Sequence, residues 1–280
     1  MTEPPGARLT LCRLKHGESG VTEVDLEDLG TSPLHQRDLP MGSYAIRVEL
    51  EGHIPVRYPV AITRLGHWDG IRPGDEQTTP IVLPPLESLD EDDCYVPAGW
   101  FIGGAEHEVL DHPIPSDRYW SDGLVSKKHP VTNAEYLCFL NDLITSGREE
   151  EALAYVPKDA GGYEGGDPVY RRESGGRFKL GEDSQGFDWA PTRPVLQIPV
   201  SAAMAYADWL SKQTGHTWRL PSELEWEKMA RGVDGRTYPW GSPFENGICH
   251  HRAALPDHFG PSEVGRFPRD QSVYGISGLA

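Results

Sequence analysis

The sequence has little basic charge for its 280 residues, with 26 Lys and Arg against 43 Asp and Glu. The formal net charge is −17 at pH 7, so the chain lacks the basic surface with which proteins bind nucleic-acid phosphates. No apolar run is long enough to predict a membrane span. The opening, MTEPPGARLT, has no apolar segment of the kind that signal peptides contain. We therefore expect neither a nucleic-acid partner nor a membrane partner.

Cysteine is scarce as well. The four cysteines contain no CxxC pair, and a secreted disulfide scaffold would be denser: Cys12, Cys94, Cys138 and Cys249. We expect reduced thiols in a cytoplasmic protein. Cys138 stands beside Phe139 on the apolar side of an expected helix, so it is predicted to be a small buried hydrophobic residue.

Several catalytic patterns are also missing. The chain has no Gly-rich loop with a VAIK lysine, no HRD loop, no DFG and no nucleophile elbow, so it contains no protein-kinase core and no recognisable hydrolase site. Glycine (31) and proline (25) are abundant, while apolar residues reach only 38%. This composition predicts short strands and many loops around a modest core.

The first 65 residues predict a small β-sandwich of three or four strands. Alternating apolar residues favour strands at 7–14, 43–50 and 55–64, and Pro59 predicts an edge strand. The words PPGARL, LGTSPL and LPMGSYAIRVELEGH resemble the PEGA-type repeat of bacterial proteins, which implies a structural spacer without activity. Prolines and an acidic run predict a linker over 66–93.

The second half contains three expected helices, at 132–147, 201–215 and 221–232. Two of them begin with capping-box spacing, at Thr132 and Ser222, and Ser201 is the expected N-cap of the middle helix. Each ends at a glycine. The glycine pair at 175–176 predicts a hairpin turn within residues 168–187.

Five sequence blocks occur in the order typical of one family: VPAGWFIGG, HPVTNAEYLCFL, PVLQIPVSAAMAYADWLSKQTG, WRLPSELEWEKMARG with RTYPWG, and GRFPRDQSVYGISGLA. Residues 94–280 thereby resemble the formylglycine-generating-enzyme, or sulfatase-modifying-factor, domain. The resemblance implies an α+β fold with a C-type-lectin-like core and much irregular structure. The chain ends where the family would continue with GN-x-W-E-W, so a C-terminally incomplete domain is expected.

The resemblance also implies metal sites. In the family a cysteine pair binds copper and activates oxygen, but none of the four cysteines here aligns with that pair, so no catalytic residue is assigned. Copper is expected only if sequence beyond residue 280 supplies the pair. The resemblance also implies calcium in the loop after YPWG, with Asn246, the carbonyl of Ile248 and Asp257 as candidate ligands. Histidines 250, 251 and 258 predict no transition-metal site, since adjacent histidines on an extended chain point to opposite sides.

The most specific block is expected to be structural. Its residues serve in helix capping, in pairing with the helix dipole, in a Glu227–Arg231 ion pair and in burial of Trp226 beneath the YPWG loop. The residues assigned to this structural block are Arg219, Glu223, Glu225, Trp226 and Trp240.

Two functions remain open. The order of PEGA-like unit, linker and this domain resembles the C-terminal part of some bacterial serine/threonine kinases, which implies a non-catalytic sensor or binding module. That module would bind a protein, a small ligand or an attached kinase domain through an aromatic surface near Trp189, Trp240 and Phe244. The alternative is a formylglycine-generating oxidoreductase whose catalytic cysteines lie outside this chain. A truncated gene product is a third possibility, since missing strands would expose sheet edges.

Overall fold

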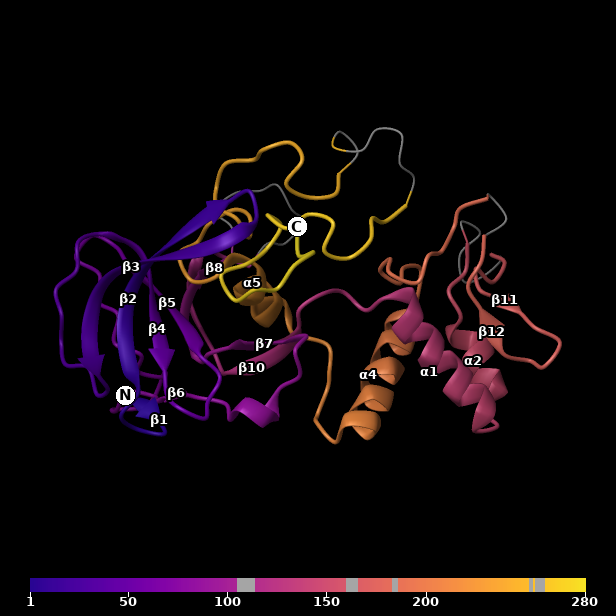
Figure 1. Ribbon diagram of the computed structural model, residues 1–280, viewed down its shortest axis with the longest axis horizontal. Coiled ribbons are helices and arrows are strands. Elements are labelled where there is room, and N and C mark those ends of the chain that lie inside the picture. Colours follow the sequence, from indigo (N-terminus) through magenta and orange to yellow (C-terminus); the bar gives the residue numbers. More distant parts are fainter. Residues whose placement is uncertain (105–113, 160–165, 183–185, 252–253, 255–259) are drawn as a thin grey trace. The chain divides into compact units, whose positions relative to one another are not determined.

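The computed structural model describes residues 1–104, 114–159, 166–182, 186–251, 254 and 260–280 (Figure 1). Contacts within the chain separate it into two compact units. Unit 1 comprises Met1–His129, Ser222–Cys249 and Phe267–Ala280, and unit 2 comprises Pro130–Pro221 and His250–Arg266. The fold is mixed α and β, as the sequence predicts. Among the described residues, no helix has the length and apolar character needed to cross a membrane.

The N-terminal part of unit 1 is a four-stranded antiparallel sheet. Its strands are β2 (Arg8–Gly17), β3 (Gly20–Thr31), β4 (Gly42–Glu49) and β5 (Val56–Ile62), in the order β3-β2-β4-β5 (Figure 1). The three expected strands are confirmed, and β5, which contains Pro59, lies at an edge. The sequence did not predict β3. The strand is acidic and most of its residues are exposed. Val24 and Leu26 alternate with acidic residues but are themselves exposed, so the short apolar pattern marks no buried face.

The second half of the expected linker packs against this sheet. β1 (Thr2–Glu3) pairs in parallel with β6 (Ile81–Val82), and a short 3₁₀ turn, η1, spans Leu86–Ser88. Leu83 is only 2% exposed and joins a cluster with residues of the sheet. Hydrophobic burial therefore fixes part of this segment in spite of its prolines.

The rest of unit 1 consists of two strand pairs and one helix. β7 (Asp93–Val96) pairs with β10 (Leu124–Lys127), and β8 (Gly99–Gly103) pairs with β9 (Asp117–Ser121). Helix α5 (Glu223–Arg231) contacts β8 and β9. Met229 of this helix belongs to a buried cluster with Val96 and with three residues of the C-terminal segment: Val273, Tyr274 and Ile276.

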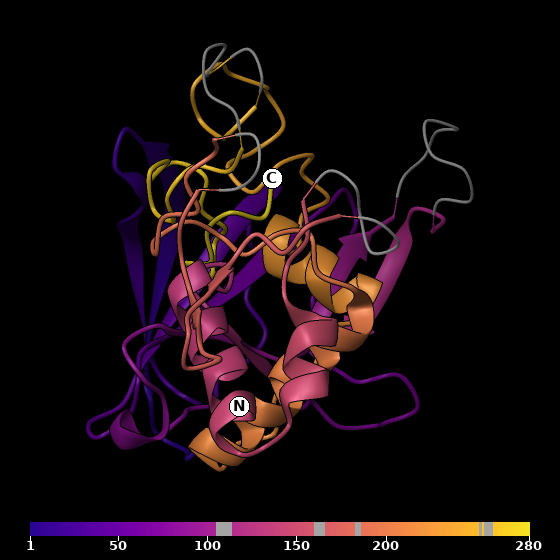
Figure 2. The ribbon, with the colours of Figure 1, turned by 90° about the vertical axis from the view of Figure 1, so that its right-hand side faces the viewer.

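Unit 2 contains helices α1 (Asn133–Thr145), α2 (Glu149–Tyr155) and α4 (Val200–Thr214), which contact one another (Figure 2). A hairpin of β11 (Arg171–Arg172) and β12 (Phe178–Lys179) turns at the expected glycines. The capping box at Thr132 is present. Ser201 is not the N-cap that we predicted, because α4 begins one residue earlier, after Pro199. Pro199 has an extended conformation there, which places the helix start at Val200.

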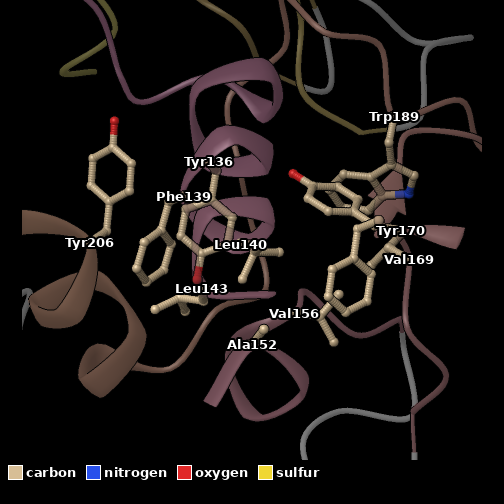
Figure 3. Close-up of a cluster of buried hydrophobic side chains, with 11 residues drawn as sticks. Tyr136, Phe139, Leu140, Leu143, Ala152, Val156, Val169, Tyr170, Trp189 and Tyr206 are labelled. Atoms are coloured by element: carbon tan, nitrogen blue, oxygen red, sulfur yellow. The ribbon is translucent and has the colours of Figure 1, made fainter. Parts of the chain in front are cut away.

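Aromatic side chains fill the core of unit 2 (Figure 3). The predicted apolar stripe of α1 is confirmed, with Tyr136, Phe139, Leu140 and Leu143 all at most 2% exposed. Cys138 is exposed, so its predicted burial is wrong. Successive residues of a helix are about 100° apart, and a residue next to the buried stripe can therefore face solvent.

Candidate functional site

Helix α5 contains most of the most specific sequence block, and it begins and ends at the capping residues that the sequence predicts. The Ser222 side chain accepts a hydrogen bond from the Glu225 backbone N–H, the Glu225 carboxylate accepts one from the Ser222 N–H at 2.7 Å, and the helix ends at Gly232. Glu223 is an exposed acid in the first turn, where the helix dipole favours negative charge. Trp226 is 44% exposed, so its predicted burial beneath the YPWG loop is wrong.

The Glu227–Arg231 ion pair is confirmed, and it joins the loop after β8 to the loop after α5. The Glu227 carboxylate accepts the backbone N–H of Gly104 at 2.9 and 3.0 Å. The Arg231 guanidinium donates to the carbonyls of Gly104 at 3.2 Å and Gly235 at 3.1 Å. Through these contacts, Glu227 and Arg231 hold the backbone of the loops in place. Arg219, which lies in unit 2, is exposed and donates to the Leu220 carbonyl at 3.1 Å.

Lys228 is a buried cation that sequence reasoning did not single out. Only 1% of the residue is exposed, and its ammonium donates to the carbonyls of Pro97 at 2.8 Å, Gly99 at 3.1 Å and Ser121 at 3.4 Å. Desolvation lowers the pKa of Lys228 to about 7, while the nearby Asp122 opposes that shift. Three carbonyls supply the acceptors that an ammonium needs, so this lysine fastens α5 to β8 and β9.

The loop after α5 stacks its aromatic rings at a tight turn. Tyr238 and Trp240 lie parallel, with ring centroids 5.1 Å apart, and Tyr238 and Gly241 exchange backbone hydrogen bonds of 2.8 and 3.0 Å. Phe244 lies against Tyr238 at 5.7 Å and is 50% exposed. The predicted open aromatic surface is correct only for Phe244. Trp240 is 6% exposed and Trp189, in the core of unit 2, is 3% exposed.

The candidate calcium ligands lie in the same loop, in part outside the described residues. Asn246 is exposed, whereas Ile248, two positions further along the chain, is buried with only 1% of the residue exposed. Asp257 lies outside the described residues. Within the described residues, no group of three or more His, Cys, Asp and Glu is arranged to hold a metal ion.

Asp270 is a second buried charged group that the sequence analysis missed. The residue is 5% exposed, and within the described part of the chain its buried Oδ1 has no hydrogen-bond partner. Burial raises the pKa of Asp270 to about 7, and its charge in turn helps to raise the pKa of the Cys249 thiol. No sequence signal marks it, because it lies in a polar run, PRDQS, whose burial depends on the packing of the C-terminal segment.

The cysteines do not fit a copper site. Cys12 lies in β2, Cys94 in β7, Cys138 on the surface of α1 and Cys249 in the loop after α5, and all four are free thiols. Burial raises the pKa of both Cys12 and Cys94 to about 11, and burial also raises that of Cys249. A Cu(I) site requires converging thiolates, so these residues supply no oxygen-activating centre of that kind.

Comparison with known proteins supports the resemblance seen in the sequence. The chain is 29% identical over 178 residues to the formylglycine-generating enzyme of Mycobacterium tuberculosis, an alignment of 51% of this chain and 56% of that protein. It is 31% identical over 197 residues to the hercynine oxygenase of Mycolicibacterium smegmatis, covering 64% and 41% of the two chains. It is 28% identical over 189 residues to the uncharacterized protein YfmG of Bacillus subtilis, covering 65% and 34%.

The chain therefore spans between about a third and just over half of the length of these relatives. Among solved structures, PvdO from Pseudomonas aeruginosa matches with a TM-score of 0.46 and 22% identity over 68% of each chain. Residues 83–277 match the family model of the sulfatase-modifying factor enzyme 1-like domain. This match covers more than half of the chain, and the protein belongs to that family.

Proposed function

We propose that residues 1–280 act as a non-catalytic binding module of the sulfatase-modifying-factor family. The observation that carries this proposal is the state of the four cysteines, which are separate and free. The three whose pKa is shifted hold their protons more tightly than an ordinary thiol. A family member can keep the fold and use it for recognition, since function depends on the site and not on the fold.

The loop after α5 is the proposed binding surface. Phe244 presents an exposed ring beside the Tyr238–Trp240 stack, which is held by backbone hydrogen bonds across the turn. A rigid aromatic anchor on a loop suits recognition of a protein or a small ligand, because little side-chain entropy is lost on binding. A C-type-lectin-like core for the whole domain would present its loops in the same way.

A thermal-shift screen of the purified chain against a library of small aromatic and polar fragments tests this proposal. We expect hits that stabilise the wild type and are lost in Phe244→Ala. The matched control is Leu153→Ala, which trims a partly exposed apolar side chain of unit 2 and should leave the hits unchanged. A screen without hits, or hits that are equally strong in Phe244→Ala, would count against this surface.

The alternative function is formation of formylglycine from a peptide cysteine, with catalytic cysteines supplied from outside this chain. Its test is incubation of the product of the full reading frame that contains residues 1–280 with a cysteine peptide, Cu(I) and oxygen, followed by mass spectrometry. The Mycobacterium tuberculosis relative, whose name states that activity, is the positive control. We expect no conversion. Oxygen-dependent conversion of the cysteine to formylglycine would overturn the non-catalytic proposal.

Calcium is the cofactor that we propose for the loop, with Asn246, the Ile248 carbonyl and Asp257 as ligands. Hard cations take oxygen ligands from such loops. After EGTA treatment, addition of calcium to about 1 mM should raise the melting temperature by roughly a few degrees, because a ligand that binds the folded state stabilises it. Asn246→Ala and Asp257→Ala should abolish the rise, whereas Asp38→Ala, at an exposed position, should preserve it. An unchanged response in the first two variants would exclude these ligands.

We also propose that this module regulates a bacterial serine/threonine kinase in the cytoplasm, as a sensor attached to it. The proposal rests on the order of sheet, Pro-rich segment and family domain. Sequencing of the coding region on both sides of residues 1–280 tests it. A kinase core in the same reading frame is expected, and a complete reading frame without one would contradict the proposal.

A further inference from the structure

The N-terminal sheet meets the C-terminal segment 267–276 inside unit 1. Gly20, at the tip of the β2–β3 hairpin, is buried at φ +103°, and a Cβ there would lie 2.7 Å from the carbonyl oxygen of Pro268. Arg57 of β5 donates to the Val273 carbonyl at 2.6 Å. Leu14 of β2 packs on the cluster that contains Val273. The hairpin tip therefore fits closely against the end of the family domain.

His16 lies at this contact and acts as a hydrogen-bond acceptor. Its Nε2 is 3.2 Å from Nη1 of Arg236. A guanidinium can only donate, so Nε2 must carry the lone pair and the proton of the neutral ring must lie on Nδ1. Nδ1 is buried and has no hydrogen-bond partner among the residues that the structure describes. The packed arrangement thus requires a neutral imidazole.

The charged groups around His16 oppose its protonation. Arg236, Arg57 and Arg269 face the ring from three different segments of unit 1. Each guanidinium already holds a carboxylate, in the pairs Asp234–Arg236, Glu23–Arg57 and Glu245–Arg269. Burial and these cations lower the pKa of His16 to about 4, while Asp234 opposes the shift. Asp234, the acidic side chain that acts on the ring, is already paired with Arg236.

We propose that His16 is an acid-sensitive latch that holds the N-terminal sheet to the C-terminal segment of the family domain. A proton on Nε2 replaces the only acceptor on the ring with a donor, which then points at the donor of Arg236. The hydrogen bond is lost and a cation faces three guanidiniums. The β2–β3 hairpin tip is released from residues 267–276 when the ring is protonated.

The sign of the pH dependence follows from the proton balance. In the released state the ring has its ordinary pKa of 6.5, and in the latched state about 4. The latched state binds fewer protons between these values, so release becomes more favourable as the pH falls from 6.5 towards 4. Protonation of His16 by itself should raise the opening equilibrium at pH 5 by up to about thirtyfold over that at neutral pH. Asp270, which burial holds at a pKa of about 7 in the same segment, acts in the opposite sense wherever opening exposes it, so the His16 contribution is measured against a variant that lacks the imidazole.

Two measurements on the intact chain test the latch. Hydrogen exchange of residues 16–22 and 267–276 should be corrected for the intrinsic pH dependence of exchange. The ratio of opening at pH 5 to opening at pH 7.5 should then be about tenfold or more larger in the wild type than in His16→Gln. His16→Gln keeps an acceptor for Arg236 and cannot titrate, so it should remove the pH response. His35→Gln, at an exposed histidine, should retain the response.

The NMR titration of the His16 ring in the wild type gives a readout that needs no variant. We expect its midpoint well below 6, with the same residues gaining mobility at that pH. A midpoint at or above 6, or equal acid-induced opening in His16→Gln, would overturn the proposal.

Discussion

At the scale of single residues, the unexpected feature is a lysine that is held by backbone oxygens. Lys228 lies between the acidic and basic residues of α5, where the sequence gives it no special role. The packing of β8 and β9 buries it and aims three carbonyls at its ammonium. Burial of a cation is costly unless its donors are satisfied, and here the acceptors all come from the main chain.

We predict that Lys228→Met lowers the free energy of unfolding by about 2–3 kcal/mol, because buried carbonyls lose a charged donor and no water can replace it. Urea denaturation at pH 6, where the ammonium is charged, measures the change. Lys212→Met, at an exposed position of α4, should stay within about 0.5 kcal/mol of the wild type. A Lys228→Met protein as stable as this control would show that the three contacts contribute nothing.

At the scale of elements, the helices follow local signals, whereas the short strands depend on side chains of other elements. The capping boxes of α1 and α5 and the glycines that end α4 and α5 are all read directly from the sequence. β12 has only two residues and cannot be stable by itself. Asn141 of α1 holds it, donating to the Phe178 carbonyl at 3.0 Å and accepting from the Phe178 N–H at 2.8 Å.

Asn141→Leu should therefore destabilise unit 2 by about 2–4 kcal/mol, because both polar backbone groups of Phe178 would be buried without partners. Near-ultraviolet circular dichroism, which reports on the aromatic core, and urea unfolding together measure the effect. Gln213→Leu replaces an exposed amide of α4 and serves as the control. If both variants unfold at the same urea concentration, Asn141 does not anchor the hairpin.

At the scale of the whole molecule, unit 1 combines the N-terminal sheet with parts of the family domain that lie far apart in the sequence. The sheet packs on Leu83 and Tyr95, and Arg57 binds the carbonyl of Val273. If the N-terminal sheet were an independent module, its buried side chains would not pack against the segments around α5. The sheet is therefore expected to be necessary for the fold of unit 1.

We predict that a chain of residues 66–280 loses the cooperative fold of unit 1. Removal of residues 1–65 would expose the apolar residues that the sheet covers, and hydrogen exchange in α5 and β7 should increase by orders of magnitude. Unit 2 has its own aromatic core, so α1 should keep most of its protection. Unchanged protection of α5 in this shortened chain would show that the sheet is a separable spacer, as the resemblance to a PEGA-type repeat implies.

The sequence determined the family, the mixed α and β class, the three capped helices and three of the four strands of the N-terminal sheet. These features depend on local signals, namely capping residues, glycines, apolar periodicity and ordered sequence words, which the chain carries wherever it folds. In the candidate site, the spacing of charged residues on α5 predicted the Glu227–Arg231 pair, which the structure contains. The calcium site at the loop with Asn246 stays a prediction from the family resemblance.

Only the tertiary structure decided the environment of the polar residues. Lys228, Asp270 and His16 look like ordinary surface residues in the sequence, and Trp226 and Cys138 look like core residues. Whether a side chain is buried depends on segments that are distant in the chain: the carbonyls around Lys228 come from residues 97–121, and the guanidiniums around His16 come from residues 57, 236 and 269. Burial and charge act through space, so neighbours along the sequence could not predict them.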